Sequence, residues 1–501
     1  MATQTSVANG VSRSPSRPSH ARFSFWPRVR AFAVPAAMIE TATTRRLAGD
    51  WAGACAAAGF DVDLDLASLA RTRGTELAAR VRSDLRHLAP DLLRWHLPRI
   101  APDGLLRPGL TVPLARYGAV HLVVRTAPAW ADGGQRLSLA LWDGTPAFRP
   151  TGPHPHPRPS RRFRFDLHRH LWDARRTGEL RTRSGAILPP AAGPDPTWSD
   201  PEAGPEGPSG PSAGLPGPAE PAGPLGDSSA PAGLRPAVGR WAAEAGILLR
   251  AEGRSHGAVA VRAAGRRLVL ELGPPGRDGD GRGTGDSTCL RITTPLRGGA
   301  ALPLLPDAAT WIPPDLELLR ADAIEPGRLH PLVADALVPG DEPAPAPAPH
   351  DPGRPRVVEC RGSLHRIGLV DGVLSPLDHG PAEVRREELL AALSGPPLPC
   401  LRAIDEAHRH PECLDGVRER LVHGDTAGAL AVVEGLLGPG AVLRGGALRD
   451  ALQAAAERRI AYGLYRAGLA EPPRAAPGPT RHKDHRPRPR HAYAHPHRPG
   501  H

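Results

Sequence analysis

The sequence predicts an α+β protein, in which small antiparallel sheets and helices, with a helical C-terminal region, are joined by long disordered linkers and tails. Glycine (56) and proline (61) together make 117 of the 501 residues, which is too many for one compact globule and lacks the period of collagen. Helical periodicity is followed by strand-like alternation twice along the chain, and the last ordered region ends in helical periodicity alone. We therefore expect several modest cores.

Composition divides the chain into three ordered regions: 38–186, 235–338 with a loop at 273–287, and 356–470. The remaining segments are rich in Pro, Gly, Ser or in His and Arg, and are expected to be disordered: 1–37, 187–234, 339–355 and 471–501. Met38 is the only methionine after Met1, and periodic sequence begins there. Residues 1–37 are therefore expected to be a disordered extension or a wrongly assigned start.

The first ordered region reads as helices followed by a sheet. Apolar residues recur at helical spacing over 77–88, and two prolines enclose a second short helix over 90–98. Three β-like runs follow, at 110–116, 119–126 and 136–142. Residues 161–165 alternate like an edge strand before a helix that starts at Asp166.

The middle region repeats this order, with a helix over 241–249, strands over 258–262, 267–272 and 289–293, and helical pieces over 315–320 and 328–337. The third region opens with a hairpin formed by 356–360 and 364–370, and everything from 382 to 469 has helical period. One short pattern, an internal echo, occurs twice in the chain: residues 424–431 match residues 49–56 at six of eight positions. This echo indicates either a helix-hairpin repeat or two convergent helix starts.

The basic residues exclude several enzyme classes. Of 63 Lys and Arg residues, 62 are Arg, and the single lysine, Lys483, lies in the His/Arg/Pro tail. P-loop NTPases, protein kinases and pyridoxal phosphate enzymes all need an ordered lysine, so all three are excluded. The net charge of +11 is weak evidence for a partner, since a GC-rich genome favours Arg codons.

Cysteine usage indicates the cytoplasm. The five cysteines are odd in number and scattered, with no C-x-x-C pair, unlike a secreted disulfide scaffold: Cys55, Cys289, Cys360, Cys400 and Cys413. No apolar run approaches the roughly 20 residues that span a bilayer. We therefore expect a cytoplasmic protein without membrane association.

Two acidic or thiol-rich clusters are candidate cation sites. Cys400, His408, His410 and Cys413 carry zinc-type donors, but they match no standard ligand spacing, and the alternative is a set of buried cysteines at a polar helix end. The run Asp61 to Asp65 could hold a divalent cation, or Asp65 could cap a helix that starts at Leu66. We expect no cofactor, and the first cluster is the metal candidate.

An Arg-rich segment, 158–183, suggests nucleic-acid binding. Arginine neutralises phosphates, and the interleaved Phe163, Phe165 and Trp172 could stack on bases. The candidate contacts are Arg158, Arg161, Arg162, Arg164, Arg169, Arg175 and Arg176. The alternative is that the aromatic residues are core and that the arginines form a solvated face.

Four stretches carry a resemblance to a known family: 41–66 (TATTRRLAGDWAGACAAAGFDVDLDL), 87–110, 160–186 and 365–379 (HRIGLVDGVLSPLDH). Together they resemble a family of uncharacterised proteins from high-GC actinobacteria. The resemblance implies a bacterial cytoplasmic setting. It implies no activity and no catalytic residue.

We expect a non-enzymatic protein-interaction or adaptor protein whose partner is another protein. The first alternative is a nucleic-acid-binding protein that uses 158–183, and the second is a metal-assisted hydrolase-type enzyme. Protein binding predicts an exposed apolar patch, and nucleic-acid binding predicts that the arginines share one face. An enzyme predicts a concave pocket that collects carboxylates or histidines.

Overall fold

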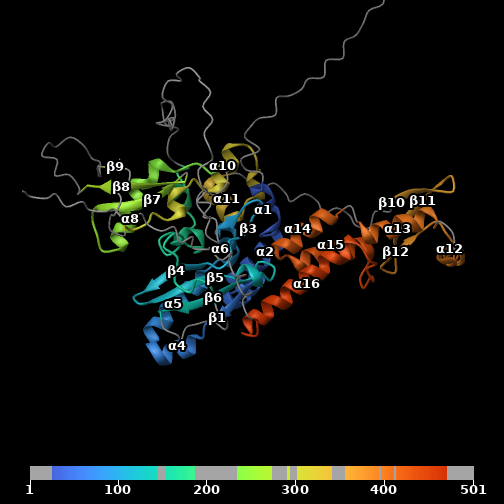
Figure 1. The fold of residues 1–501 in the computed structure, drawn as a ribbon, viewed down its shortest axis with the longest axis horizontal. Coiled ribbons are helices and arrows are strands. Elements are labelled where there is room, and N and C mark those ends of the chain that lie inside the picture. Colours follow the sequence, from blue (N-terminus) through green and yellow to red (C-terminus); the bar gives the residue numbers. More distant parts are fainter. Residues whose placement is uncertain are drawn as a thin grey trace, which may run out of the picture.

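The computed structural model describes residues 25–144, 154–186, 234–263, 265–273, 290–293, 302–340, 356–393, 397–410 and 413–470. Figure 1 shows an elongated arrangement, with the N-terminal sheet near the centre and the small sheets β7–β9 and β10–β12 toward opposite ends. Small sheets alternate with groups of helices along the chain, so the fold is α+β, as the sequence predicts.

The N-terminal region is built on a four-stranded sheet with the order β1-β6-β5-β4. Its strands are β1 (Phe60–Asp63), β4 (Thr111–Tyr117), β5 (Val120–Thr126) and β6 (Leu137–Trp142). The antiparallel meander β4–β5–β6 is the predicted one, whereas β1 pairs with β6 in parallel and was not predicted. Consecutive residues along β4 to β6 are buried, so both faces of this sheet are covered.

Helices and short elements complete this region. They are α2 (Ala36–Leu47), α3 (Trp51–Ala57), α4 (Leu66–Arg73), α5 (Thr75–His87), α6 (Pro90–His96), β2 (Arg99–Ile100), β3 (Leu105–Leu106) and α7 (Glu179–Arg183). The predicted helices over 77–88 and 90–98 correspond to α5 and α6. Helix α6 is buried along most of its length, and its residues Leu92, Leu93 and Trp95 lie at the centre of the core.

Residues 25–37 correct the sequence prediction, which placed them in a disordered extension. They form α1 (Trp26–Phe32) and the turn that leads into α2, and Trp26, Val29 and Val34 are buried in the N-terminal core. A helix of seven residues makes too few turns to show clear periodicity, so composition dominated the prediction.

The middle region contains α8 (Trp241–Ala251), the antiparallel sheet β7 (Gly257–Ala263), β8 (Arg266–Leu272) and β9 (Leu290–Thr293), and α9 (Asp307–Thr310). Helix α8 and the three strands agree with the predicted elements in type and order, whereas the short helix α9 was not predicted. They enclose a second core around Trp241, whose indole Nε1 donates to the Thr310 carbonyl oxygen at 3.1 Å.

Helices α10 (Pro314–Arg320) and α11 (Pro331–Leu337) follow the middle sheet in sequence but belong to the N-terminal core. Leu318 and Val333 are completely buried there. Asp315 accepts hydrogen bonds from Arg30 Nε at 2.7 Å and from Trp95 Nε1 at 2.9 Å. The predicted boundary at 235–338 therefore does not separate independent units.

The C-terminal region begins with the antiparallel sheet β10 (Arg356–Cys360), β11 (Ser363–Val370) and β12 (Val373–Pro376), of which only the first two strands were predicted. Helices follow: α12 (Pro381–Leu393), α13 (Pro399–Arg409), α14 (Leu414–His423), α15 (Thr426–Leu437) and α16 (Ala447–Arg466). Helix α13 touches two cores, because Ile404 packs with the sheet and Ala407 packs with α14 to α16.

Helix α16 returns to the N-terminal region, where the Tyr462 hydroxyl donates to Asp61 and Arg466 pairs with Asp63. Asp65 caps α4 by accepting from Ala67 N at 2.8 Å, which confirms the helix-cap interpretation. The acidic run therefore anchors two helices, and two of its carboxylates are occupied by residues from the far end of the chain.

The two echoing segments have the same local structure. Asp50 caps α3 by accepting from Gly53 N at 2.8 Å, and Asp425 caps α15 by accepting from Gly428 N at 2.9 Å. In both places a helix ends, the chain turns, and an alanine-rich helix begins. The two segments thus share an aspartate cap at the start of the second helix of a helix hairpin.

Residues 161–165 form no strand, and their Phe163, Arg164 and Phe165 are all buried in irregular structure. The predicted loop at 273–287 and the segments 187–234, 339–355 and 471–501 lie almost entirely outside the described residues.

Candidate metal centre

Four zinc-type donors converge at the far end of the C-terminal region: Cys360, His365, His379 and Cys400. The two sulfur atoms and one nitrogen from each imidazole all lie within 4.8 Å of one another. Bonds of about 2.3 Å to sulfur and about 2.05 Å to nitrogen in a tetrahedron put ligand atoms roughly 3.3 to 3.8 Å apart. The four donors therefore lie close to this spread, and small side-chain movements would bring them onto a single Zn²⁺.

The β10–β11 hairpin supplies the first two donors. Its turn is made by Arg361 and Gly362, with φ of 52° and 79°, and Cys360 pairs across the ladder with Ser363. Because side chains alternate along a strand, Cys360 and His365 lie on the same face of the hairpin. A tight turn thus brings two donors together that are five positions apart.

Helix α13 supplies the third donor. Pro399 occupies the first turn of this helix, where a missing N–H costs nothing. Cys400 follows it, and Ile404 lies one turn further along the same face. Both are buried against Cys360 and Ile367 of the hairpin, so apolar packing holds the Cys400 thiol over the hairpin face.

His379, the fourth donor, precedes α12, and a carboxylate on α12 orients its imidazole ring. Its Nε2 lies 2.8 Å from Nδ1 of His365, while its Nδ1 lies 3.3 Å from Oε2 of Glu383 in the first turn of α12. Metal-bound histidines commonly donate their outer N–H to a carboxylate, which fixes the ring orientation and the tautomer. Glu383 has that position here, so His379 turns Nε2 toward the cluster.

Burial determines the protonation state of the Cys400 thiol. Cys360 and Cys400 have no exposed surface. Burial, together with the neighbouring Cys360 thiol, raises the pKa of Cys400 to about 11. A thiol in this setting is inert as a nucleophile at neutral pH, and a bound cation would displace its proton.

The donor set favours a structural metal. Two thiolates and two imidazoles fill all four positions of a tetrahedral Zn²⁺, which leaves no open position for a substrate. The surrounding core is small and consists of Cys360, Ile367, Leu398, Cys400 and Ile404. A core of this size gains much of its stability from a cross-link such as a metal.

Of the four sequence candidates, only Cys400 lies in this group of donors. Cys400 belongs to the cluster, but no group of three donors in the described residues includes His408, His410 or Cys413. His408 is buried two turns along α13 from Cys400, and His410 is exposed at the end of that helix. Cys413 packs against the helices of the α14–α16 core.

Cys360, His365 and His379 were missed, and only the first two left a signal in the sequence. A cysteine and a histidine on the two strands of the predicted hairpin lie on one face of it. His379 and Cys400 join them only through tertiary packing, which ligand spacing in the sequence does not show.

Most candidate arginines of the Arg-rich segment 158–183 form ion pairs within the protein. Five of its seven candidate arginines contact carboxylates: Arg162 with Asp307, Arg164 with Asp166, Arg169 with Asp84, Arg175 with Asp173, and Arg176 with Glu179. Arg158 and Arg161 are exposed. Most of the positive charge that nucleic-acid binding would use is thus offset by acidic side chains.

The aromatic residues of this segment are core residues. Phe163, Phe165 and Trp172 are 7%, 3% and 0% exposed, and Trp172 Nε1 donates to the Phe165 carbonyl oxygen at 3.1 Å. They cannot stack on bases in the folded protein. Nucleic-acid binding by 158–183 stays a prediction without a specific observation in its favour.

Comparisons of the chain with protein-family models, curated proteins and solved structures find no match. Within the described ranges, every helix is too short or too polar to cross a lipid bilayer. The geometry of the candidate sites is therefore the basis for a functional proposal.

Proposed function

We propose that this protein is a metal-dependent protein-interaction protein. A Zn²⁺ held by Cys360, His365, His379 and Cys400 folds the segment 356–410 into a metal module, which we define as β10–β12, α12 and α13. The observation that carries the proposal is the convergence of two thiols and two imidazoles from the β10–β11 hairpin, the segment before α12, and α13. The metal has a structural role, and the module is the part that binds a partner.

The outer face of the module supports a role in binding. Residues alternate along the sheet, so Val357, Leu364, Val370 and Val373 lie on the face opposite the donors. These four aliphatic side chains are 55%, 73%, 45% and 53% exposed. Exposed aliphatic side chains at both ends of one sheet face suit a surface that another protein covers.

The position of the module agrees with this role. In Figure 1 the sheet β10–β12 lies at the far end of the C-terminal region, away from the N-terminal sheet. Glu359 and Arg366 are exposed on the same sheet face and would add polar contacts around the aliphatic residues. We propose a partner protein with an apolar surface as the occupant.

Metal analysis of the purified full-length chain tests the first half of the proposal. We expect about one zinc per chain, and loss of that zinc in Cys360→Ser and in His379→Ala. The matched controls, Cys413→Ser and His410→Ala, should keep the metal. Two results would overturn the metal site. One is a zinc content well below one per chain together with thermal unfolding that a chelator does not change. The other is a Cys360–Cys400 disulfide in protein purified in a reducing buffer.

Site-specific photo-crosslinking in the source cells tests the second half. A photoreactive side chain at position 364 should give one discrete protein adduct, and the same group at Arg449, exposed on α16, should not. The adduct at 364 should disappear when Cys400→Ser removes the metal. Equal labelling at both positions would rule out the sheet face as the docking surface.

A further inference from the structure

A cavity lies where the N-terminal and middle cores meet, separate from the metal module. Its volume is about 360 Å³, which is within the range of small-molecule sites. Leu234 lines this cavity and packs against both cores. Protein interiors contain few voids larger than a water molecule, so a cavity of this size at the junction of two cores is a candidate for a second binding site.

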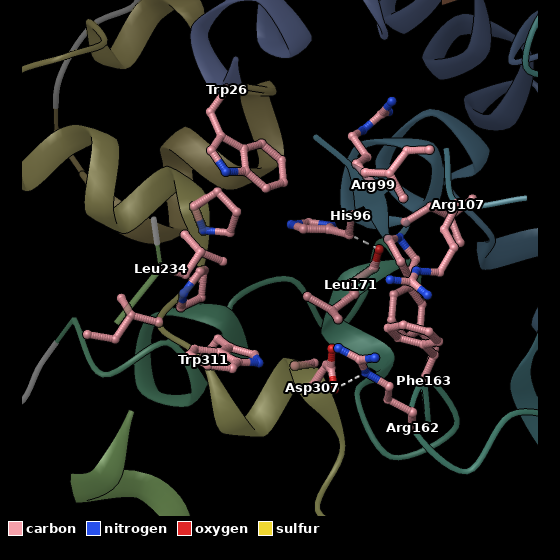
Figure 2. A pocket seen from close by; sticks show the side chains of 18 of the residues that line it. Trp26, His96, Arg99, Arg107, Arg162, Phe163, Leu171, Leu234, Asp307 and Trp311 are labelled. Atoms are coloured by element: carbon pink, nitrogen blue, oxygen red, sulfur yellow. Dashed lines mark hydrogen bonds and ion pairs between the residues drawn. The ribbon is translucent and has the colours of Figure 1, made fainter. Parts of the chain in front are cut away.

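Most of the cavity wall is apolar. Aromatic rings come from Trp26, Phe163 and Trp311, and aliphatic surface comes from Leu171 and Leu234. Figure 2 shows Trp26 and Trp311 on opposite sides of one central space. The indole nitrogens of Trp26 and Trp311 are buried below the wall, so these two residues offer ring surface rather than hydrogen-bond donors. A ligand with an aromatic body would displace water from this surface.

Two guanidinium groups of the wall are already paired with carboxylates of the protein. Arg162 Nε donates to Asp307 Oδ1 at 2.7 Å, and Arg183 Nη2 donates to Glu244 Oε2 at 2.7 Å. Each of these charges thus has its counter-ion within the fold. A charged ligand head would have to displace one of these partners.

Arg99 does not provide an anion site either. It donates to the main-chain carbonyl oxygens of Gly104 and Arg94, both at 3.0 Å. Figure 2 shows its guanidinium turned away from the central space. An ionic ligand in that space would lose its hydration without gaining an ion pair from Arg99, whereas a neutral ligand has far less hydration to lose. The wall therefore favours a neutral ligand.

His96 supplies a specific polar contact on this wall. Both hydrogen bonds that its ring makes within the described residues run through Nδ1, which lies 3.1 Å from the carbonyl oxygens of Leu92 and Leu171. Because both partners are acceptors, Nδ1 carries the proton and Nε2 carries a lone pair. Burial lowers the pKa of His96 to about 4, so the ring is neutral at physiological pH.

The Nε2 atom of His96 faces the cavity. His96 is half-buried, and in Figure 2 the ring nitrogen opposite the Leu171 contact points into the central space between Trp26 and Trp311. When a ligand displaces water from this space, only a hydrogen-bond donor on the ligand replaces the bond that water gives to Nε2. One acceptor on an otherwise apolar wall thus selects a ligand with a donor at one point of its rim.

We propose that this cavity binds a small neutral aromatic molecule that carries a hydroxyl group, with its ring system between Trp26 and Trp311 and its hydroxyl donating to Nε2 of His96. The size of the cavity, its apolar wall and its single oriented acceptor each support this class of ligand. The inference is independent of the metal centre. It gives the protein a small-molecule site beside its protein-interaction module.

Calorimetric titration of the full-length protein tests the proposal with probes that share one ring system. The probe 2-naphthol offers a hydroxyl donor, 2-methoxynaphthalene has a similar shape without a donor, and naphthalene-2-sulfonate carries a negative charge. We expect saturable binding of 2-naphthol and roughly tenfold or weaker binding of the other two, because neither satisfies Nε2 of His96. No saturable binding of 2-naphthol, or equal or tighter binding of either other probe, would overturn the proposal.

His96→Phe removes the acceptor and keeps an aromatic ring at this position. The affinity for 2-naphthol should fall roughly tenfold, to the level of 2-methoxynaphthalene, whose own affinity should stay the same. The variant also loses the Nδ1 hydrogen bonds, so the unchanged affinity for 2-methoxynaphthalene is the control for an intact cavity. Equal losses for both ligands would mean that His96 only shapes the cavity, which would contradict the hydroxyl contact.

Ile312→Trp tests where the ligand lies. Ile312 is a half-buried residue of the cavity wall, so an indole at this position takes up space in the cavity and should abolish binding of 2-naphthol. Ile460→Trp, at a position on α16 that is 64% exposed, is the matched control and should leave the affinity unchanged. Binding of 2-naphthol that survives Ile312→Trp would place the ligand elsewhere and overturn the site.

Discussion

Arg94 Nη2 donates to the main-chain carbonyl oxygen of His423 at 2.8 Å, joining residues 329 positions apart. The same guanidinium donates to the carbonyl oxygens of Ala33 at 3.0 Å and Gln135 at 2.7 Å. Arg94 is 2% exposed, and burial lowers its pKa to about 10. One buried side chain thus ties the end of α14 to three segments of the N-terminal core.

Arg94→Met should therefore destabilise the whole chain and loosen the C-terminal helices. It leaves three buried carbonyl oxygens without donors, which costs on the order of 3 kcal/mol in the free energy of unfolding. We expect a lower midpoint in denaturant unfolding and faster proteolysis between α14 and α16. Arg82→Met, at an exposed position on α5, is the control and should change stability by less than about 0.5 kcal/mol. Equal effects of both variants would contradict the structural role of Arg94.

Asp315 has a similar role for residues 25–34. Asp315→Ala leaves the buried Arg30 cation without its partner and removes the acceptor of Trp95 Nε1. Breaking a buried pair in this way should cost about 3 to 5 kcal/mol of unfolding free energy. Asp335→Ala, exposed on α11, should be nearly neutral.

The double variant Arg30→Met with Asp315→Leu provides a second check on this pair. It removes both charges and should recover part of the loss, because an apolar pair leaves no uncompensated ion. If Asp315→Ala unfolds the protein no more easily than Asp335→Ala, α1 does not dock on α10 as described.

Acid should weaken the contact between the 163–183 segment and α8. Burial alone would raise the pKa of Glu244, but its close contact with His168 and the hydrogen bonds from Arg183 outweigh burial and lower the pKa to about 2. A lowered carboxylate pKa gives stability that is present above the ordinary value near 4.5 and is lost as the pH falls toward 2. The full contribution is on the order of 3 kcal/mol.

Unfolding of Glu244→Gln and of the unaltered protein, followed from pH 6 to pH 3, measures this contribution. The difference in unfolding free energy should be largest at pH 6 and should shrink steadily below pH 4.5. Glu179→Gln, which removes a more exposed partner of Arg176, should give a small difference at every pH. A Glu244→Gln difference that does not change with pH would refute the assignment.

Local chemistry made the secondary structure predictable from the sequence. The hairpin around Gly118, the helix through Val81 and Leu85, and the cap at Asp65 all depend on residues within a few positions of one another. The strand at 60–63 was missed because it is short and pairs with β6, more than seventy positions later. Nothing within the segment itself selects that partner.

The candidate sites depend on residues that are distant in sequence, which explains why they were only partly predicted. Cys400 was a candidate because a zinc-type donor is recognisable alone, but its partner Cys360 is forty positions earlier. The cavity lined by Trp26, His96, Phe163 and Trp311 likewise combines residues from α1, the end of α6, the segment 162–183 and the segment after α9. In an Arg-rich chain, charge density also misled the prediction, because buried pairs such as Arg164 with Asp166 look like a solvated basic patch in sequence.

The paired helix starts at Asp50 and Asp425 give a final prediction. A β-carbon on Gly53 would lie 2.0 Å from Oδ2 of Asp50, and one on Gly428 would lie 2.2 Å from Oδ2 of Asp425. Glycine inside a helix is normally worse than alanine by about 1 kcal/mol, but here it leaves room for the capping carboxylate. Gly53→Ala and Gly428→Ala should therefore lower the melting temperature. Gly463→Ala in α16 meets nothing within 4 Å and should raise it, and calorimetry on the three variants decides. A rise at all three positions would mean that the aspartate caps tolerate a β-carbon and that the glycine in the echo has no capping role.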